Sequence, residues 1–260
     1  MRDIDESKAP LIEHLIELRR RLLISVAALF ISGVICYYFA DQLLAFLVQP
    51  LKDGFGADTG RLVYTKLYEA FFVELKVALF GAFFISFPIT ANQLWLFIAP
   101  GLYAKEKRAL LPFLLATPIL FVGGAAFAYY LVMPTAFHFF LKFQGDAGGL
   151  SVEALPSMDS YLSLVMQFIL AFGISFLLPV LVMLLNRAGI VSRAQLIGAR
   201  RYVIVGAVVV AAVLTPPDVI SQLMLAIPLC LLYELALIAI WFTDRRAAKE
   251  SDEQAIVKAE

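Results

Sequence analysis

Charged residues are scarce in this sequence. Asp, Glu, Lys and Arg make up 16% of the 260 residues, whereas 62% are hydrophobic and the mean hydropathy is +0.85. A typical soluble domain is about 25% charged and about 45–50% apolar. This scarcity excludes an ordinary soluble protein and indicates an integral membrane protein. The formal net charge is zero, and we expect no nucleic-acid partner.

The residues that usually carry enzyme chemistry are also few. The two histidines, His14 and His138, fall on opposite sides of the membrane in the topology derived below, which excludes a His–His metal pair. Cys36 and Cys230 lie far apart in apolar runs and have no metal-ligand spacing. The sequence contains no HExxH motif, no P-loop and no Gly-rich dinucleotide turn. We therefore expect no enzyme, no metal and no cofactor.

Long apolar stretches are what the sequence does contain. A helix needs about 20 apolar residues to cross the hydrocarbon core. Six candidate spans are present, at about 22–40, 70–97, 109–132, 161–185, 202–214 and 220–242. We predict an all-α membrane protein of six transmembrane helices in a single polytopic domain, 1–260, with a polar cytoplasmic tail at 243–260. The fifth and sixth spans are expected to be short, and the second is expected to end at "APG", 99–101.

The basic residues predict the orientation. Sixteen of the 21 Lys and Arg residues lie on the side of the termini. They are Arg2, Lys8, Arg19, Arg20, Arg21, Lys105, Lys107, Arg108, Arg187, Arg193, Arg200, Arg201, Arg245, Arg246, Lys249 and Lys258. The positive-inside rule then places both termini in the cytoplasm.

The two long outer segments have amphipathic or aromatic sequences. "DQLLAFLVQPL", which we expect to end at Pro50, and "TAFHFFLKF" both predict interfacial helices. Glu74 and Lys76 are expected at the boundary of the second span. Glu234 is the best candidate for a buried acid in the sixth span, either in a functional pocket or packed against a polar neighbour.

"TPPD" separates the last two spans. Its two prolines, Pro216 and Pro217, break the helix, and Asp218 is placed to cap the next one. The motif predicts a rigid hairpin or, alternatively, a docking corner for another membrane helix.

Acids near the inner surface form the second unusual pattern. In "IEHLIELRRRLL" Glu17 lies one turn after Glu13 and four residues before Arg21, on an amphipathic helix that leads into the first span. Glu106 is the only acid in its loop, among three cations. These acids either neutralise a surface helix or bind a cationic peptide, while the cations attract anionic lipid.

Several motifs together resemble the TatC family of twin-arginine protein translocases. They are "HLIELRRRLL" at 14–23, "QLWLFIAPGLYAKEKR" at 93–108, "FAYYLVMPTAF" at 127–137, "AFGISFLLPV" at 171–180 and "LTPPDVISQ" at 214–222. The resemblance covers residues 10–242.

The resemblance implies a receptor for twin-arginine signal peptides in the bacterial inner membrane. Such a receptor assembles TatA and TatB single-span subunits, self-associates and exports folded proteins, driven by the proton-motive force. The implied signal-peptide residues are Glu17, Glu106, Arg19 and Phe97. The implied structural or partner-contact residues are Pro50, Tyr129, Pro216, Pro217, Asp218, Gln222 and Glu234.

One position departs from the family pattern. Many members carry Glu or Gln where this chain has Leu177, and Gln167 is the nearest polar residue in that span. A secondary transporter of small molecules or ions is the alternative function, but buried charge is sparse and no internal repeat is evident.

Overall fold

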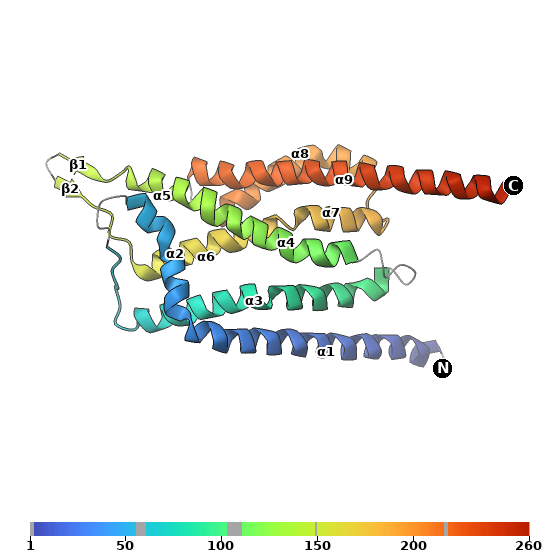
Figure 1. The fold of residues 1–260 in the computed structure, drawn as a ribbon, viewed down its shortest axis with the longest axis horizontal. Coiled ribbons are helices and arrows are strands. Elements are labelled where there is room, and N and C mark those ends of the chain that lie inside the picture. Colours follow the sequence, from blue (N-terminus) through green and yellow to red (C-terminus); the bar gives the residue numbers. More distant parts are fainter. Residues whose placement is uncertain (1–2, 56–60, 103–110, 149, 216–217, 260) are drawn as a thin grey trace. The chain divides into compact units, whose positions relative to one another are not determined.

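Figure 1 shows the fold in a computed structural model that describes residues 3–55, 61–102, 111–148, 150–215 and 218–259. The helices are α1 (Asp3–Tyr38), α2 (Ala40–Phe55), α3 (Glu69–Leu102), α4 (Leu111–Phe127), α5 (Met133–Leu141), α6 (Met158–Ser175), α7 (Leu178–Arg187), α8 (Arg193–Leu214) and α9 (Val219–Ala259). A π-helical segment, Ala128–Val132, joins α4 to α5. Strands β1 (Gly145–Ala147) and β2 (Leu150–Val152) form a short antiparallel hairpin.

Six helical stretches are long and apolar enough to cross a membrane. They are His14–Tyr38, Glu69–Phe97, Phe113–Leu141, Met158–Arg187, Arg193–Leu214 and Val219–Arg245. The predicted all-α fold with six spans is confirmed. The two outer segments are helical as predicted, as α2 and α5, but α5 also continues the third apolar stretch to Leu141.

The described chain divides into two compact units. The first unit contains residues 1–119 and 133–166, and the second contains residues 120–132 and 167–260. In the first unit α1 and α3 run side by side (Figure 1). Cys36, Ala78 and Ala82 are buried between them. A Cβ atom added at Gly81 would lie 2.9 Å from Leu43 Cδ1, so this glycine permits close packing.

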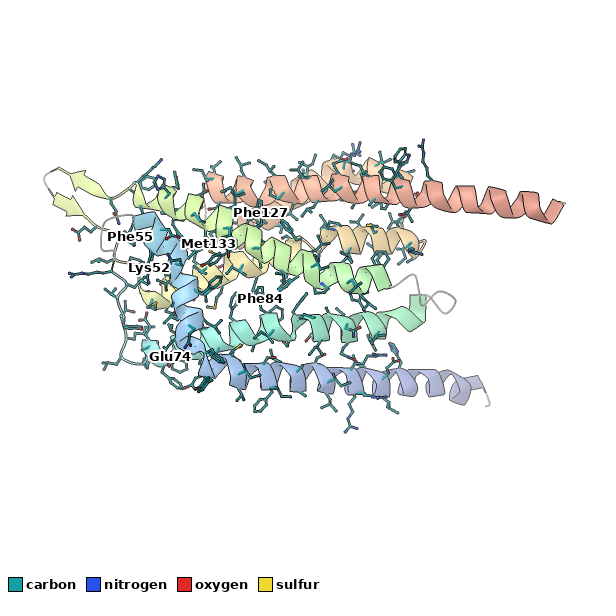
Figure 2. All side chains as sticks on the ribbon, in the orientation of Figure 1. Lys52, Phe55, Glu74, Phe84, Phe127 and Met133 are labelled. Carbon is teal, nitrogen blue, oxygen red and sulfur yellow. The ribbon has the colours of Figure 1, made fainter. Side chains whose placement is uncertain are left out.

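Helix α2 packs against α3 and α5 through its buried face. Leu47, Pro50 and Leu51 are buried, whereas Lys52 in the last turn is exposed (Figure 2). The Tyr161 hydroxyl donates a hydrogen bond of 2.8 Å to the Leu47 carbonyl, one turn before Pro50. The prediction that Pro50 ends this helix is wrong, because these tertiary contacts support the backbone past the proline.

The second unit has two apolar cores. One consists of Ala128, Val132, Phe172, Ala207, Ala211, Leu225, Ala226 and Leu229. The other consists of Val182, Leu196, Tyr233, Ala236, Leu237 and Ile240. Helices α8 and α9 lie side by side and contribute to both (Figure 1).

Three helix boundaries differ from those expected. Helix α3 continues through 99–101 to Leu102, and the fourth span is two helices, α6 and α7, because Pro179 follows the break at 176–177. Helix α8 begins at Arg193, where Ser192 and Gln195 form a capping box. Its 22 residues span about 33 Å, and the apolar stretch of α9, Val219–Arg245, has 27 residues, so the expectation of short fifth and sixth spans is corrected.

Candidate functional site

A polar cluster lies where α1 and α3 pack together near the start of the first apolar run. Arg21 donates from Nε (3.0 Å) and Nη2 (2.5 Å) to Oε1 of Glu17, one turn earlier on α1. Its Nη1 also donates to Oε1 of Gln93 on α3, at 3.4 Å. The predicted Glu17–Arg21 pair is confirmed, and Arg21 additionally links the two helices.

One turn away the aromatic rings of His14 and Phe97 are stacked. Their centroids are 4.4 Å apart and their planes differ by 19°. Phe97 follows Gln93 by four residues, and His14 precedes Glu17 by three, so each pair lies on one helix face. The structure therefore brings Phe97 and Glu17, both predicted from the sequence, to the same end of the α1–α3 pair.

The two carboxylate oxygens of Glu17 have different surroundings. Both hydrogen bonds from Arg21 go to Oε1, and no described residue donates to Oε2. The Glu17 side chain is 34% exposed, against 20% for Arg21. Glu17 is therefore held in place through one oxygen while the other can accept hydrogen bonds from a second cation.

Two members of this cluster were not assigned a role from the sequence. Gln93 falls within the "QLWLFIAPG" stretch, and its spacing to Phe97 is the signal that was available. His14 was considered only as a possible metal ligand. Arg19 is exposed and makes no ion pair with a described side chain. Glu106 lies outside the described residues.

The segment between α8 and α9 is a second candidate. Asp218 Oδ1 accepts a hydrogen bond of 2.7 Å from the Ser221 backbone N–H, which confirms the predicted N-cap. The Gln222 amide donates to the Val208 carbonyl (3.3 Å), and the Gln167 amide donates to the Leu214 carbonyl (2.9 Å). Pro216 and Pro217 lie outside the described residues.

Two polar atoms near the start of α9 make no hydrogen bond with the described residues. Asp218 Oδ2 and the Ser221 hydroxyl are buried and have no hydrogen-bond partner among the described residues. Buried polar groups in proteins nearly always find partners. These two atoms are therefore exceptions among the described residues.

Glu234 is not the buried acid that we considered. Its Oε2 accepts a hydrogen bond of 2.7 Å from Arg200 on α8, and both side chains are nearly half exposed. The alternative, packing against a polar neighbour, is the one that the structure supports. The partner escaped prediction because Arg200 was placed before the fifth span, whereas α8 begins seven residues earlier.

Two further predicted residues are buried inside helical segments. Pro50 is buried within α2, and Tyr129 is buried within the π-helical segment. The π turn precedes Pro134, which has no N–H to donate and whose ring crowds the preceding turn, so local widening of the helix is expected. Leu177 lies at the break between α6 and α7 and makes no side-chain cap.

Comparison with known proteins identifies one family. A family model described as "Sec-independent protein translocase protein (TatC)" matches residues 13–228. A protein of Magnetococcus marinus with the same description is 51% identical over 251 residues, covering 96% of this chain and 91% of that protein. One from Rickettsia prowazekii is 43% identical and covers 89% and 92%, respectively.

Solved structures agree. A crystal structure described as "Twin Arginine Translocase Receptor- TatC in DDM" matches with a TM-score of 0.75 and 39% identity, covering 87% of this chain and 98% of the other. A second crystal structure, described as "Twin Arginine Translocase Receptor- TatC", matches with a TM-score of 0.73 and 40% identity. It covers 86% of this chain and 96% of the other.

Proposed function

This chain belongs to the TatC family of Sec-independent protein translocases, and from that premise we propose that it is the receptor for twin-arginine signal peptides within its translocase. It is a multi-pass membrane protein of a protein-translocation family. The finer role, recognition of a signal peptide with adjacent arginines followed by assembly of a transport site for folded cargo, is the proposal.

The geometry of Glu17 is the observation that carries this proposal. Arg21 neutralises and orients the carboxylate through Oε1, no described residue donates to Oε2, and the side chain is partly exposed. A preorganised acceptor loses little side-chain entropy when a ligand binds. An incoming guanidinium can therefore bind without displacing Arg21.

The chemistry of the two basic side chains accounts for a preference for arginine. Guanidinium is a rigid planar donor that bonds carboxylates in fixed directions, whereas the lysine ammonium is compact and strongly hydrated. The stacked Phe97 and His14 rings lie one turn away and offer a flat surface beside the acid. Glu106 supplies the second acid in this proposal, on the basis of family resemblance.

The partners in this proposal are TatA and TatB, together with further copies of the chain. The segment around Asp218, whose Oδ2 and Ser221 hydroxyl have no partner among the described residues, supports contact with a partner helix that carries a polar group. Gln222, Tyr129 and Glu234 complete the proposed set of contact residues. The location is the inner membrane with both termini cytoplasmic, and the energy source is the proton-motive force.

Peptide binding to the full-length chain in membranes tests the proposal. A twin-arginine peptide should crosslink at least about tenfold more strongly than its twin-lysine variant, because a hydrogen bond to a charged group contributes about 1.5–3 kcal/mol. Glu17→Gln should remove most of this discrimination. Glu153→Gln, which changes an exposed acid elsewhere in the same unit, should leave it unchanged.

Two results would contradict the receptor proposal. One is equal crosslinking of both peptides by the wild-type chain. The other is unchanged discrimination in the Glu17→Gln, Glu106→Gln double variant. Uptake of a small solute by the purified chain in vesicles would instead support the secondary-transporter alternative.

A further inference from the structure

An exposed apolar surface lies at the start of α3. It comprises Tyr64, Leu67, Tyr68, Phe71 and Phe72, each about half exposed or more, and Leu67 is fully exposed. Tyr68 and Phe71 both make edge-on ring contacts with Phe72. Exposed apolar side chains are expected along a membrane span, but Tyr64, Leu67 and Tyr68 lie before the span that begins at Glu69. We refer to it as the 64–72 surface.

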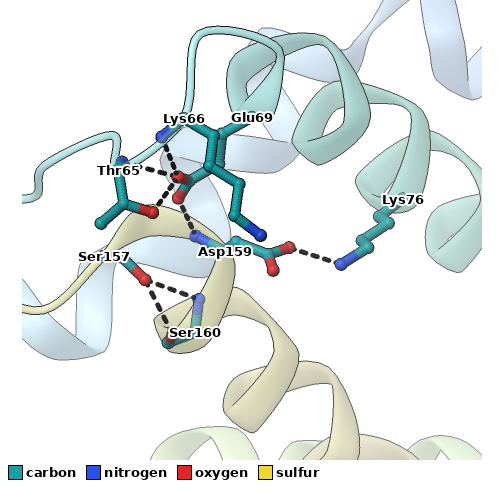
Figure 3. A network of polar contacts seen from close by, with 7 residues as sticks. All are labelled: Thr65, Lys66, Glu69, Lys76, Ser157, Asp159 and Ser160. Atoms are coloured by element: carbon teal, nitrogen blue, oxygen red, sulfur yellow. Dashed lines mark hydrogen bonds and ion pairs between the residues drawn. The ribbon is translucent and has the colours of Figure 1, made fainter.

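The loop that carries this surface is braced by one carboxylate (Figure 3). Glu69 Oε2 accepts hydrogen bonds from the Thr65 N–H (2.7 Å), the Thr65 hydroxyl (2.8 Å) and the Lys66 N–H (3.1 Å). Its other oxygen, Oε1, accepts one from the Asp159 N–H of α6, at 3.0 Å. Glu69 is only 4% exposed. One side chain therefore fixes the loop and joins it to the start of α6.

Further bonds hold the same two segments together. The Val63 N–H donates to the Pro156 carbonyl (3.2 Å), and the Met158 N–H donates to the Val63 carbonyl (3.0 Å). Lys76 of α3 forms an ion pair with Asp159 (Figure 3). Leu67 is therefore exposed on a loop that these hydrogen bonds and the Glu69 carboxylate hold in one conformation.

The exposed charges in the described part of the loop before α3, 61–68, are positive. Arg61 and Lys66 are exposed on the loop, and Lys66 Nζ lies 5.9 Å from the Tyr68 ring centroid. Glu69, the acid within the surface, is buried and accepts four hydrogen bonds, and Glu74, three residues after Phe71, is half-buried. Tyrosines, leucines and cations beside the first residue of an apolar span are typical of the layer of lipid headgroups.

We propose that the 64–72 surface binds phospholipid at the bilayer interface, with its apolar side chains inserted and Lys66 and Arg61 toward the phosphates. Pairing with a second copy is disfavoured, because two-fold contact would bring the same cations together. The proposal goes beyond peptide recognition and does not depend on it.

Spin labelling of the full-length chain tests this. In a Cys230→Ala background, which leaves only the buried Cys36, a label is placed at Leu67→Cys or at Glu153→Cys as an exposed reference. The chain is reconstituted in vesicles of phosphatidylethanolamine and phosphatidylglycerol. Collisions with oxygen, relative to those with a water-soluble nickel chelate, should be several-fold more frequent at position 67 than at position 153.

The variant Glu69→Gln tests whether the Glu69 carboxylate holds the loop in place. An amide has one accepting oxygen and one donating nitrogen, so either the loop or the Asp159 N–H loses its acceptor. The label at position 67 should then become more mobile, and its oxygen-to-nickel ratio should fall toward the reference. Glu74→Gln, a half-buried acid on the same helix, should change neither property.

Two outcomes would overturn the proposal, and a third would overturn the role given to Glu69. Equal ratios at positions 67 and 153 would show that the surface lies in water. Dipolar broadening between labels on two copies, with little oxygen contact, would show that a second copy covers it. A label at position 67 that is unaffected by Glu69→Gln would show that Glu69 does not hold the surface in place.

Discussion

Gly124 lies where α4 packs against the end of α6. A Cβ atom added there would lie 2.5 Å from the carbonyl oxygen of Phe172 and 2.8 Å from two atoms of Phe176. The first of these contacts is with backbone, which cannot rotate away. The absence of a side chain at this single residue therefore allows α4 and α6 to pack.

We expect Gly124→Ala to lower the free energy of unfolding by about 1–3 kcal/mol, the usual cost of overpacking. A lower Tm of the purified chain would measure this. The adjacent Gly123 is the matched control, since a Cβ there would meet nothing within 4 Å. Gly123→Ala should leave Tm unchanged or raise it, because alanine favours the helix. An equal fall in Tm for both variants would contradict the packing explanation.

At the residue scale the sequence predicted pairs within one helix better than pairs between helices. Glu17 and Arg21 could be paired from their spacing alone, because four residues are one turn. Arg21 with Gln93, His14 with Phe97, and Arg200 with Glu234 are separated by 34 residues or more. Their contacts depend on which helix faces meet, and spacing along the chain does not contain that information. Glu69 accepts three of its four hydrogen bonds from Thr65 and Lys66, so only its link to Asp159, 90 residues away, could not be predicted from local spacing.

At the scale of elements, capping residues determine where a helix begins more closely than the extent of the apolar run does. Ser192 and Gln195 start α8 by reciprocal hydrogen bonds at 3.3 Å and 2.8 Å, nine residues before the apolar run that we used to place the span. Asp218 performs the same function at the start of α9. Caps satisfy backbone N–H groups that otherwise lack partners, so they set where a helix begins.

We expect Asp218→Ala to destabilise the start of α9 by about 0.5–2 kcal/mol, the range measured for lost N-caps. Faster hydrogen–deuterium exchange in the first turns of α9 would show it. Asp218→Asn should retain slow exchange, because its side-chain oxygen still accepts from the Ser221 N–H. Asp244→Ala, at an exposed position of the same helix, is the control. Fast exchange in Asp218→Asn would instead point to a role for the carboxylate charge or for Oδ2.

At the scale of the whole molecule, the prediction to test is the orientation of the chain in the membrane. Because 16 of 21 basic residues fall on the side of the termini, we expect both ends of the chain in the cytoplasm. Green fluorescent protein fused after Glu260 should fluoresce, and alkaline phosphatase inserted in the β1–β2 turn should be active outside. Inactive phosphatase at that turn, with the fusion protein inserted in the membrane, would contradict this topology.

The sequence by itself determined the class, the number of spans and the family, because apolar length and local motifs are properties of contiguous residues. The tertiary structure decided where helices begin and end, which acids are paired, and which oxygen of Glu17 receives no hydrogen bond from the described residues. It also decided that Leu67 is exposed on a braced loop. Those features depend on contacts between residues far apart in the chain, whose free energies are gained only when helices pack.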